Sequence, residues 1–231
     1  MARVLSFFFS LLLFFSASVG FAQQKVTHKT FSVKPLNETK ALPELAAFVQ
    51  QVITACTNKD TAFLLNIVSD SVAISHGGES YGKTDFLEDF IQKMDGFSRL
   101  KEALVLGGTI EKEEGHDVYQ FPYVQSHRFY SPQLDNYEVD LYTTVIGLKP
   151  FLGVFSKPSL KAPKSAVLAY PILQLAEDGD HEDPVWAKVL TYDNKVQGFV
   201  QWKDVYAASG ITVQIIKEGD AFKIISVAPF D

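Results

Sequence analysis

Hydrophobic positions follow two different periods along this chain. Between residues 42 and 108 they recur at spacings of three and four, which is typical of one face of a helix. From residue 109 onward they alternate with polar positions in short runs, and turn-forming segments such as the one at 192–195 separate these runs. The pattern therefore predicts helices in the first half and strands in the second, which is an α+β arrangement.

Four helices are expected in the first half, each with one apolar face. Their ranges are 42–60, 60–68, 84–94 and 97–108. The apolar stripe of the first helix consists of Leu45, Phe48, Val49, Val52, Ile53 and Cys56. Asp60 is a candidate N-cap for the second helix, because its carboxylate can accept a hydrogen bond from the first helical turn. The polar stretch before the first helix lacks a clear period and is expected to lie on the surface or to move freely.

Short β-like runs follow the helices. One further strand is expected earlier in the chain, at 71–76, between the second and third helices. The runs after the helices cover 118–124, 138–147, 153–159, 166–176, 186–192, 196–202, 211–217 and 221–227. In one of them Trp186, Lys188 and Leu190 share a face, and the Trp186 indole is expected to belong to the core of the β-structure. The last two runs form a C-terminal hairpin around the turn at 217–221.

Within this β-rich half, residues 144–206 resemble the bacterial Src-homology 3 (SH3) type barrel domain. The residues that carry the resemblance are Gly153, Val154, Lys157, Pro158, Ser159, Ser165, Val167, Trp186, Lys188, Val189, Gly198, Phe199 and Val200. Phe155 and the acidic insert at 177–184 depart from the family pattern. The resemblance implies a small β-barrel with a non-catalytic accessory role, since such modules usually bind peptidoglycan peptides or protein partners.

The order of the pieces also resembles that of secreted Gram-negative bacterial proteins of unknown function. The shared pieces are the Leu-Gly-Gly element at 106–108, the Phe-Pro-Tyr-Val strand at 121–124 and the closing hairpin. The same order is compatible with a cystatin-like cone of the nuclear-transport-factor-2 type in the first domain. In that alternative the C-terminal hairpin returns to the sheet of the N-terminal domain, and otherwise it pairs with the barrel.

We therefore expect an α+β fold with a mainly helical N-terminal domain, a small SH3-like β-barrel and a C-terminal β-hairpin. The expected segments are a signal peptide at 1–22, a leader at 23–41, the helical domain at 42–135, the barrel at 136–206 and the hairpin at 207–231. The chain that follows the signal peptide is long enough for one or two domains with cores of their own.

The N-terminal segment has the features of an export signal. An apolar run spans residues 4–15, and Gly20 and Ala22 stand at −3 and −1 of a cut before Gln23. The alternative is an uncleaved anchor. The run is too short to span a bilayer comfortably, and no later segment is apolar enough to do so. The cleaved chain is therefore expected to be periplasmic or secreted, with no membrane span.

Charge and cysteine content narrow the partners further. The formal net charge is −6, and cleavage of the signal peptide removes Arg3, so the mature chain is more acidic still. Such a chain is a poor candidate for binding nucleic acid or an anionic membrane surface. Cys56 is the only cysteine, so an intramolecular disulfide is impossible and packing must supply the stability.

No convincing catalytic or metal site stands out in the sequence. Cys56 lies on the buried stripe near the C-terminal end of its helix, where the helix dipole raises a thiol pKa, so we expect a core residue rather than a nucleophile. The histidines lack paired metal-ligand spacing. They are His28, His76, His116, His127 and His181. We therefore expect no enzyme activity, no cofactor and no metal.

Four aromatic residues near expected strand ends are the candidate ligand-binding residues, namely Tyr170, Tyr192, Trp202 and Tyr206. They can line a shallow groove for a peptide or a glycan, although packing between the two domains explains them equally well. We expect a secreted, non-catalytic protein whose SH3-like barrel recognises cell-envelope peptidoglycan, as a cell-wall peptide or glycan, or an envelope protein. The alternatives are a cystatin-like N-terminal domain that binds a small molecule near Phe86 and Phe90, and a cell-wall hydrolase accessory.

Overall fold

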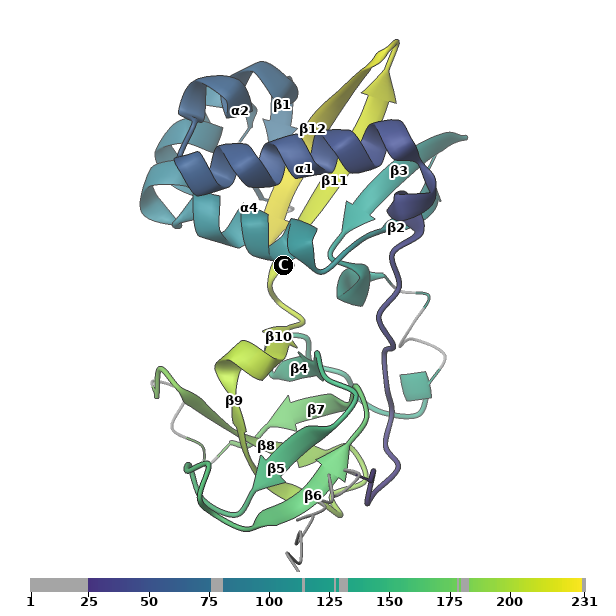
Figure 1. Ribbon diagram of the computed structural model, residues 1–231, viewed down its shortest axis with the longest axis vertical. Coiled ribbons are helices and arrows are strands. Elements are labelled where there is room, and N and C mark those ends of the chain that lie inside the picture. The colour runs from purple at the N-terminus through teal and green to yellow at the C-terminus, as the bar shows by residue number, and fades with distance from the viewer. Residues whose placement is uncertain are drawn as a thin grey trace, which may run out of the picture.

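A computed structural model of the chain describes residues 25–75, 81–113, 115–126, 128, 133–177, 179 and 183–229. The expected signal peptide at 1–22 lies outside these residues. The described chain forms two lobes (Figure 1). The first lobe, drawn above, has helices packed over a sheet, and the second lobe, drawn below, is built mainly from strands.

Five strands form the sheet of the first lobe. Their order across the sheet is β1 (Val68–Ala73), β12 (Ala221–Pro229), β11 (Ile211–Glu218), β3 (His116–Phe121) and β2 (Thr109–Glu113). β1 pairs with β12 in parallel, and the other neighbours are antiparallel. The C-terminal hairpin β11–β12 therefore returns to the first lobe and lies between β1 and β3.

Helices cover one face of this sheet. They are η1 (Glu38–Ala41), α1 (Pro43–Asn58), α2 (Thr61–Ile67), α3 (Gly82–Asp85), the π-helix η2 (Phe86–Lys93) and α4 (Gly96–Val105). α1 begins at Pro43, which suits a first turn, and ends before Lys59 in the left-handed conformation. Asp60 caps α2 as predicted, because its Oδ1 accepts a hydrogen bond from the backbone N–H of Phe63 at 3.0 Å. No helix in the described ranges is long and apolar enough to cross a bilayer.

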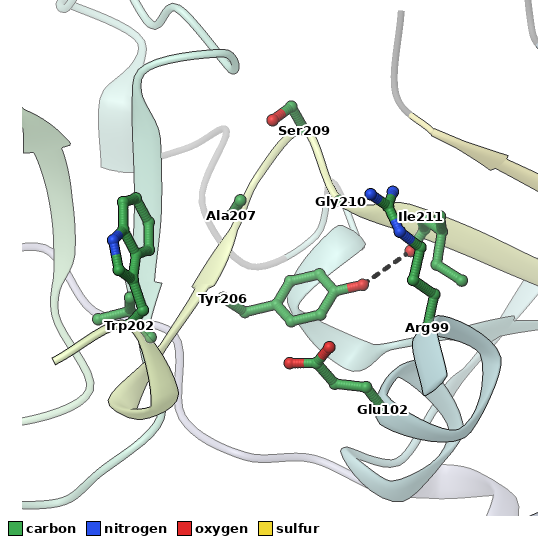
Figure 2. A pocket seen from close by; sticks show the side chains of 9 residues that line it. Arg99, Glu102, Trp202, Tyr206, Ala207, Ser209, Gly210 and Ile211 are labelled. Carbon is green, nitrogen blue, oxygen red and sulfur yellow. Dashed lines mark hydrogen bonds between the residues drawn. The ribbon is translucent and has the colours of Figure 1, made fainter. Parts of the chain in front are cut away.

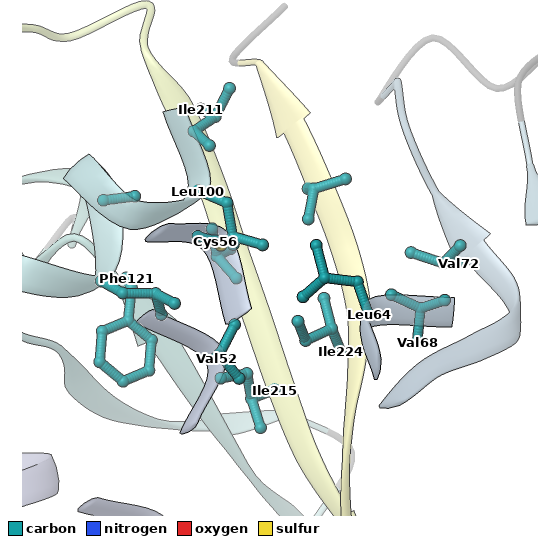
Figure 3. Packing of buried hydrophobic residues seen from close by; sticks show 14 of the residues in the cluster. Val52, Cys56, Leu64, Val68, Val72, Leu100, Phe121, Ile211, Ile215 and Ile224 are labelled. Carbon is teal, nitrogen blue, oxygen red and sulfur yellow. The ribbon is translucent and has the colours of Figure 1, made fainter. Parts of the chain in front are cut away.

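The first core lies between these helices and the sheet (Figure 3). Val52 of α1, Leu64 of α2 and Leu100 of α4 are fully buried. On the sheet they face the side of the hairpin that carries Ile215 and Ile224, which are also fully buried. Burial of a side chain of this size contributes about 1.5–3 kcal/mol. The helices and the C-terminal hairpin therefore depend on each other for stability.

Phe86 and Phe90 belong to the same core. Both side chains are fully buried, and their ring centroids lie 5.5 Å apart. Gly96 permits this close packing, since a Cβ atom there would stand 2.8 Å from the Phe90 ring. The two rings fill the space between the helices rather than line an open pocket.

Seven strands form the sheet of the second lobe. Their order is β10 (Val205–Ala207), β4 (Thr144–Gly147), β7 (Ile172–Leu175), β8 (Trp186–Thr191), β9 (Gln197–Gln201), β5 (Leu152–Phe155) and β6 (Lys164–Leu168). On β8 the buried positions are Ala187, Val189 and Thr191. Trp186 therefore lies on the other face, half-buried, with its ring edge-on to Phe155 at 5.7 Å between centroids. The expectation that Trp186 is a core residue is wrong.

The predicted fold class is wrong in both halves. The chain is mostly β, and its first lobe rests on a five-stranded sheet rather than forming a helical domain. Helical spacing dominates that part of the sequence because two strands of its sheet come from the far end of the chain. The second lobe is not a closed SH3-like barrel, since its edge strands β10 and β6 do not pair within the described residues. The hairpin is likewise not a separate unit.

We call residues 25–37 the strap. It runs extended along the second lobe and then up to the first (Figure 1). At the β6 edge the backbone N–H of Thr27 donates to the carbonyl of Val167 at 2.9 Å, and the N–H of Val167 donates to Thr27 Oγ1 at 2.8 Å. Further along, the N–H of Ile172 donates to the carbonyl of Phe31 at 2.8 Å. At β6 the strap thus takes up hydrogen-bonding groups on a sheet edge that a closed barrel would pair with another strand, whereas at Phe31 it bonds to the start of an inner strand, β7.

A further apolar cluster joins the two lobes and the strap. We call it the interlobe cluster, and its buried members are Val33, Tyr123, Val124, Leu134, Ile146, Ile172, Tyr192 and Tyr206. Val33 comes from the strap, Tyr123 from the 3-10 turn η3 (Tyr123–Gln125) after β3, and Ile146 from β4. An apolar interface of this kind limits motion of one lobe against the other.

Glu38 anchors the upper end of the strap to the first lobe. Its backbone N–H donates to the carbonyl of Gly108 at 2.9 Å, and its carboxylate accepts a hydrogen bond from the N–H of Ile110 at 2.8 Å. Arg128 Nη2 donates to the same carboxylate at 2.7 Å, and this bond is the main cause that lowers the pKa of Glu38. The strap is therefore held to the second lobe near its beginning and to the first lobe where it reaches Glu38.

Candidate functional site

A groove lies where β10 of the second lobe approaches α4 of the first (Figure 2). We call it the interlobe groove. Its lining residues are Arg99, Glu102, Trp202, Val205, Tyr206, Ala207, Ser209, Gly210 and Ile211, and its volume is about 430 Å³. Small-ligand sites have volumes of roughly 300–1,000 Å³ and occur preferentially between domains. Size and position therefore suit a small ligand or a short segment of a larger one.

Trp202 forms one wall of the groove. It begins the 3-10 turn η4 (Trp202–Asp204), which follows β9. Its indole Nε1 donates a hydrogen bond to the carbonyl of Asp183 at 2.9 Å, and its backbone N–H donates to the carbonyl of Val185 at 3.0 Å. These bonds fix the orientation of the half-buried ring. A ligand can therefore stack against the indole at little cost in side-chain ordering.

Tyr206 forms the floor of the groove. The residue lies on β10 and is 7% exposed. Its hydroxyl donates a hydrogen bond to the carbonyl of Ile211 at 3.1 Å, where the chain crosses from the second lobe into β11 of the first (Figure 2). Burial raises the pKa of this phenol far above its ordinary range. The hydroxyl therefore stays neutral and acts as a donor that links the two lobes.

Two opposite charges form the wall on the other side. Arg99 and Glu102 stand three positions apart on α4, so they share one face of that helix. Both side chains are exposed. Within the part of the chain that the structure describes, no ion pair engages either of them. The groove thus combines aromatic rings with a guanidinium and a carboxylate.

Tyr192 and Tyr170 lie outside the groove. Tyr192 is 4% exposed, and a hydrogen bond of 2.8 Å joins its hydroxyl to Oγ1 of Thr144. Its ring packs edge-on against Phe31 of the strap, with 6.2 Å between centroids. Tyr170 is half-buried, and its backbone carbonyl accepts a hydrogen bond from the N–H of Val33. Of the four candidate residues, two therefore meet in the groove and two lie against the strap.

Arg99 and Glu102 are not recognisable as site residues from the sequence. The same helix also carries Lys101, and charged residues on the exposed face of a helix are ordinary. Only the return of the C-terminal hairpin to the first lobe brings residues 205–211 against α4. That contact is long-range, and no local pattern reports it.

Cys56 lies in the first core, which confirms the expectation of a buried thiol. Its side chain is 4% exposed, and burial raises its pKa to about 12. The positive charge of Lys101 acts in the opposite direction, but its effect is smaller. A thiol that is buried and protonated is a poor nucleophile.

Cys56 should therefore resist thiol reagents in the folded protein. We expect alkylation by iodoacetamide at about pH 8 to be at least about a hundredfold slower than in guanidinium chloride, because the unfolded thiol regains its ordinary pKa near roughly 8.5. Since Cys56 is the only cysteine, the mass of the intact protein reports the reaction. Similar rates in the folded and unfolded states would show that the thiol is accessible.

Two of the five histidines lie within the described residues. His28 Nε2 lies 3.3 Å from the carboxylate of Asp193, and His116 is exposed at the start of β3. The other three lie outside the described residues, namely His76, His127 and His181. Among the residues with described positions, no three His, Cys, Asp or Glu side chains are grouped as metal ligands.

A second hollow lies over β7 and β8. Its volume is about 650 Å³, and it carries the acidic side chains of Glu138, Asp140 and Glu177. It is larger than the interlobe groove but has no aromatic residue in its lining. The interlobe groove is the better candidate, because its walls come from both lobes and hydrogen bonds hold its aromatic side chains in place.

The resemblance of residues 144–206 to the bacterial SH3 type domain stays a prediction. No family model, no curated protein and no solved structure matches this chain.

Proposed function

We propose that this protein is a secreted, non-catalytic binding protein that recognises cell-envelope peptidoglycan through the interlobe groove. The apolar run at 4–15 supports export to the periplasm or the exterior. The groove offers an indole, a guanidinium and a carboxylate together. This mixture supports the peptide portion of peptidoglycan as the bound part, since a peptide carries apolar, anionic and cationic groups side by side.

The observation that carries the proposal is the convergence of two distant segments on one groove. Trp202 and Tyr206 come from the second lobe and Arg99 from the first. Hydrogen bonds within the chain hold both aromatic side chains. A site with this degree of order loses little side-chain freedom on binding. Its geometry therefore favours recognition by a preformed surface.

Recognition is proposed rather than catalysis because of the groups that line the groove. The thiol of Cys56 is buried in the first core and is not part of the lining. Ser209 contributes a hydroxyl, but nucleophilic catalysis needs a base within hydrogen-bonding distance of such a group. No histidine lines the groove within the described residues. The charged groups present are suited to binding opposite charges on a ligand.

A pull-down with purified peptidoglycan tests this function. Arg99→Gln and Trp202→Ala should each reduce the apparent affinity by about tenfold, because each removes an interaction of roughly 1.4 kcal/mol. Lys101→Gln is the matched control, since it removes a charge from the same helix outside the groove lining. This control should be retained like the native protein.

Thermal unfolding of each variant separates lost binding from lost folding. Arg99 is exposed, so Arg99→Gln should unfold at the native temperature while it binds more weakly. Trp202 packs against the buried core of the second lobe, which includes Val189 and Val200, so Trp202→Ala can also lower stability and its result is read together with that of Arg99→Gln. Equal retention of the native protein and both groove variants would contradict the proposed function.

A further inference from the structure

Two charged residues of the interlobe groove, Arg99 and Glu102, indicate what its ligand carries. We infer that the groove binds a zwitterionic peptide, with Arg99 bound to a carboxylate of the ligand and Glu102 bound to an ammonium group. This inference rests on the proposed function and adds the chemical class of the ligand to it.

The geometry of α4 sets the separation of the two charges. Residues three positions apart on a helix have Cβ atoms about 5–6 Å apart. Arg99 and Glu102 both line the groove and lie beside Tyr206 in Figure 2. A short peptide can carry the two groups at a comparable separation where a side-chain amine lies near its terminal carboxylate. One such ligand can therefore reach both side chains at once.

Both charges act on the same point of the groove floor. The pKa of the Tyr206 phenol is raised mainly by burial, but Glu102 raises it further and Arg99 lowers it. Both charged side chains lie beside this phenol in Figure 2. The groove therefore presents a positive and a negative group around one hydrogen-bonded hydroxyl.

The two charges are also available to a ligand. Some surface charges are paired within the chain, as Lys217 is with Glu44 at 2.8 Å. Within the described residues Arg99 and Glu102 have no such partner. A ligand that pairs with both forms charge-assisted hydrogen bonds, which are stronger than neutral ones.

The charge of the whole chain favours a zwitterion over a simple anion. The formal net charge of −6 repels anions at long range, and Glu102 would repel a carboxylate within the groove. A ligand that also brings an ammonium group removes this second repulsion. Trp202, on the opposite wall, supplies an apolar face for the carbon skeleton.

Charge-modified fragments test the inference. The probes are muropeptides released by a muramidase from the same peptidoglycan, used untreated, N-acetylated to remove ammonium charges, or amidated to remove carboxylate charges. Titration calorimetry gives their affinities for the native protein, for Arg99→Gln and for Glu102→Gln. For the native protein, each modification should weaken binding by about tenfold. Amidation should then have little further effect on Arg99→Gln, and acetylation little further effect on Glu102→Gln.

The pattern of losses decides the outcome. For each matched pair of variant and modification, the loss of binding free energy should be smaller for the combination than for the sum of the two single changes. Such non-additive losses identify the two groups as partners. Losses of binding free energy that simply add for both matched pairs would overturn the assignment. If native protein binds untreated fragments but neither modification changes the affinity, the inference fails while the proposed function stands. If untreated fragments and intact peptidoglycan both fail to bind, the proposed function fails as well.

Discussion

Deletion of residues 23–36 will lower the unfolding temperature of the second lobe by about 10 °C or more. The deletion removes Val33 from the interlobe cluster and Phe31, which packs against that cluster, together with the hydrogen bonds at the β6 edge. Loss of one buried and one half-buried side chain of this size costs about 3–5 kcal/mol. In a chain of this length each kcal/mol corresponds to roughly 2–4 °C. The backbone hydrogen bonds lost with the strap add to this effect.

Fluorescence and circular dichroism distinguish the two lobes in this experiment. Both tryptophans, Trp186 and Trp202, belong to the second lobe. Their emission therefore follows unfolding of that lobe, whereas the helical signal follows the first lobe. We expect the fluorescence midpoint to fall further than the helical midpoint, because residues 27–33 bond to the second lobe.

Two further variants show whether packing or the backbone is responsible. The double variant Phe31→Ala and Val33→Ala keeps the strap and should reproduce most of the loss. Lys34→Ala is the matched control, since its side chain is exposed on the same segment. A deletion variant with the native midpoint in both signals would show that the strap does not stabilise the second lobe.

The helices could be predicted from the sequence because their signals are local. The apolar stripe of α1 places Leu45, Val52 and Cys56 on its buried face, and each interval involves only a few residues. The Asp60 cap depends on a neighbour three positions away. Such features do not depend on the rest of the chain, so these predictions are correct although the predicted fold class is wrong.

The sheets could not be predicted because their strand partners are distant. Ile224 pairs with Val68, so β1 meets the opposite end of the chain. The alternation at β8 fits either face, and a shift of one residue exchanges buried and exposed positions. Packing in the buried core of the second lobe turns Ala187 and Val189 inward and leaves Trp186 on the other face. Sequence alternation alone therefore did not determine the register.

The candidate site could be predicted only in part from the sequence, because some of its residues meet only through contacts between distant segments. Aromatic residues near strand ends point to Trp202 and Tyr206, which do meet in the groove. The same reasoning also selects Tyr192, which the strap covers. Arg99 and Glu102 become recognisable only when the hairpin brings the second lobe against α4. A groove between lobes is thus a property of the tertiary fold rather than of any one segment.

A single methyl group at position 198 should destabilise the second lobe about as much as loss of the strap. Gly198 lies on β9, and its Cβ in Gly198→Ala would overlap the carbonyl oxygen of Phe155 and stand 2.8 Å from Cγ1 of Val154. The oxygen belongs to the backbone of β5, so the overlap is relieved only if the two strands move apart. Overpacking typically costs about 1–3 kcal/mol. We expect a loss of at least about 3 kcal/mol here, measured by tryptophan fluorescence during unfolding in urea.

Gly153→Ala provides the matched control on the neighbouring strand. A Cβ atom at Gly153 would meet mainly the far end of the Lys164 side chain, at 3.0 Å, which can turn toward solvent. This variant should therefore keep nearly native stability. Equal stability of the two variants would mean that β5 and β9 are not packed so closely. Trp202 follows β9 directly, so that result would also remove the rigid support on which its wall of the groove depends.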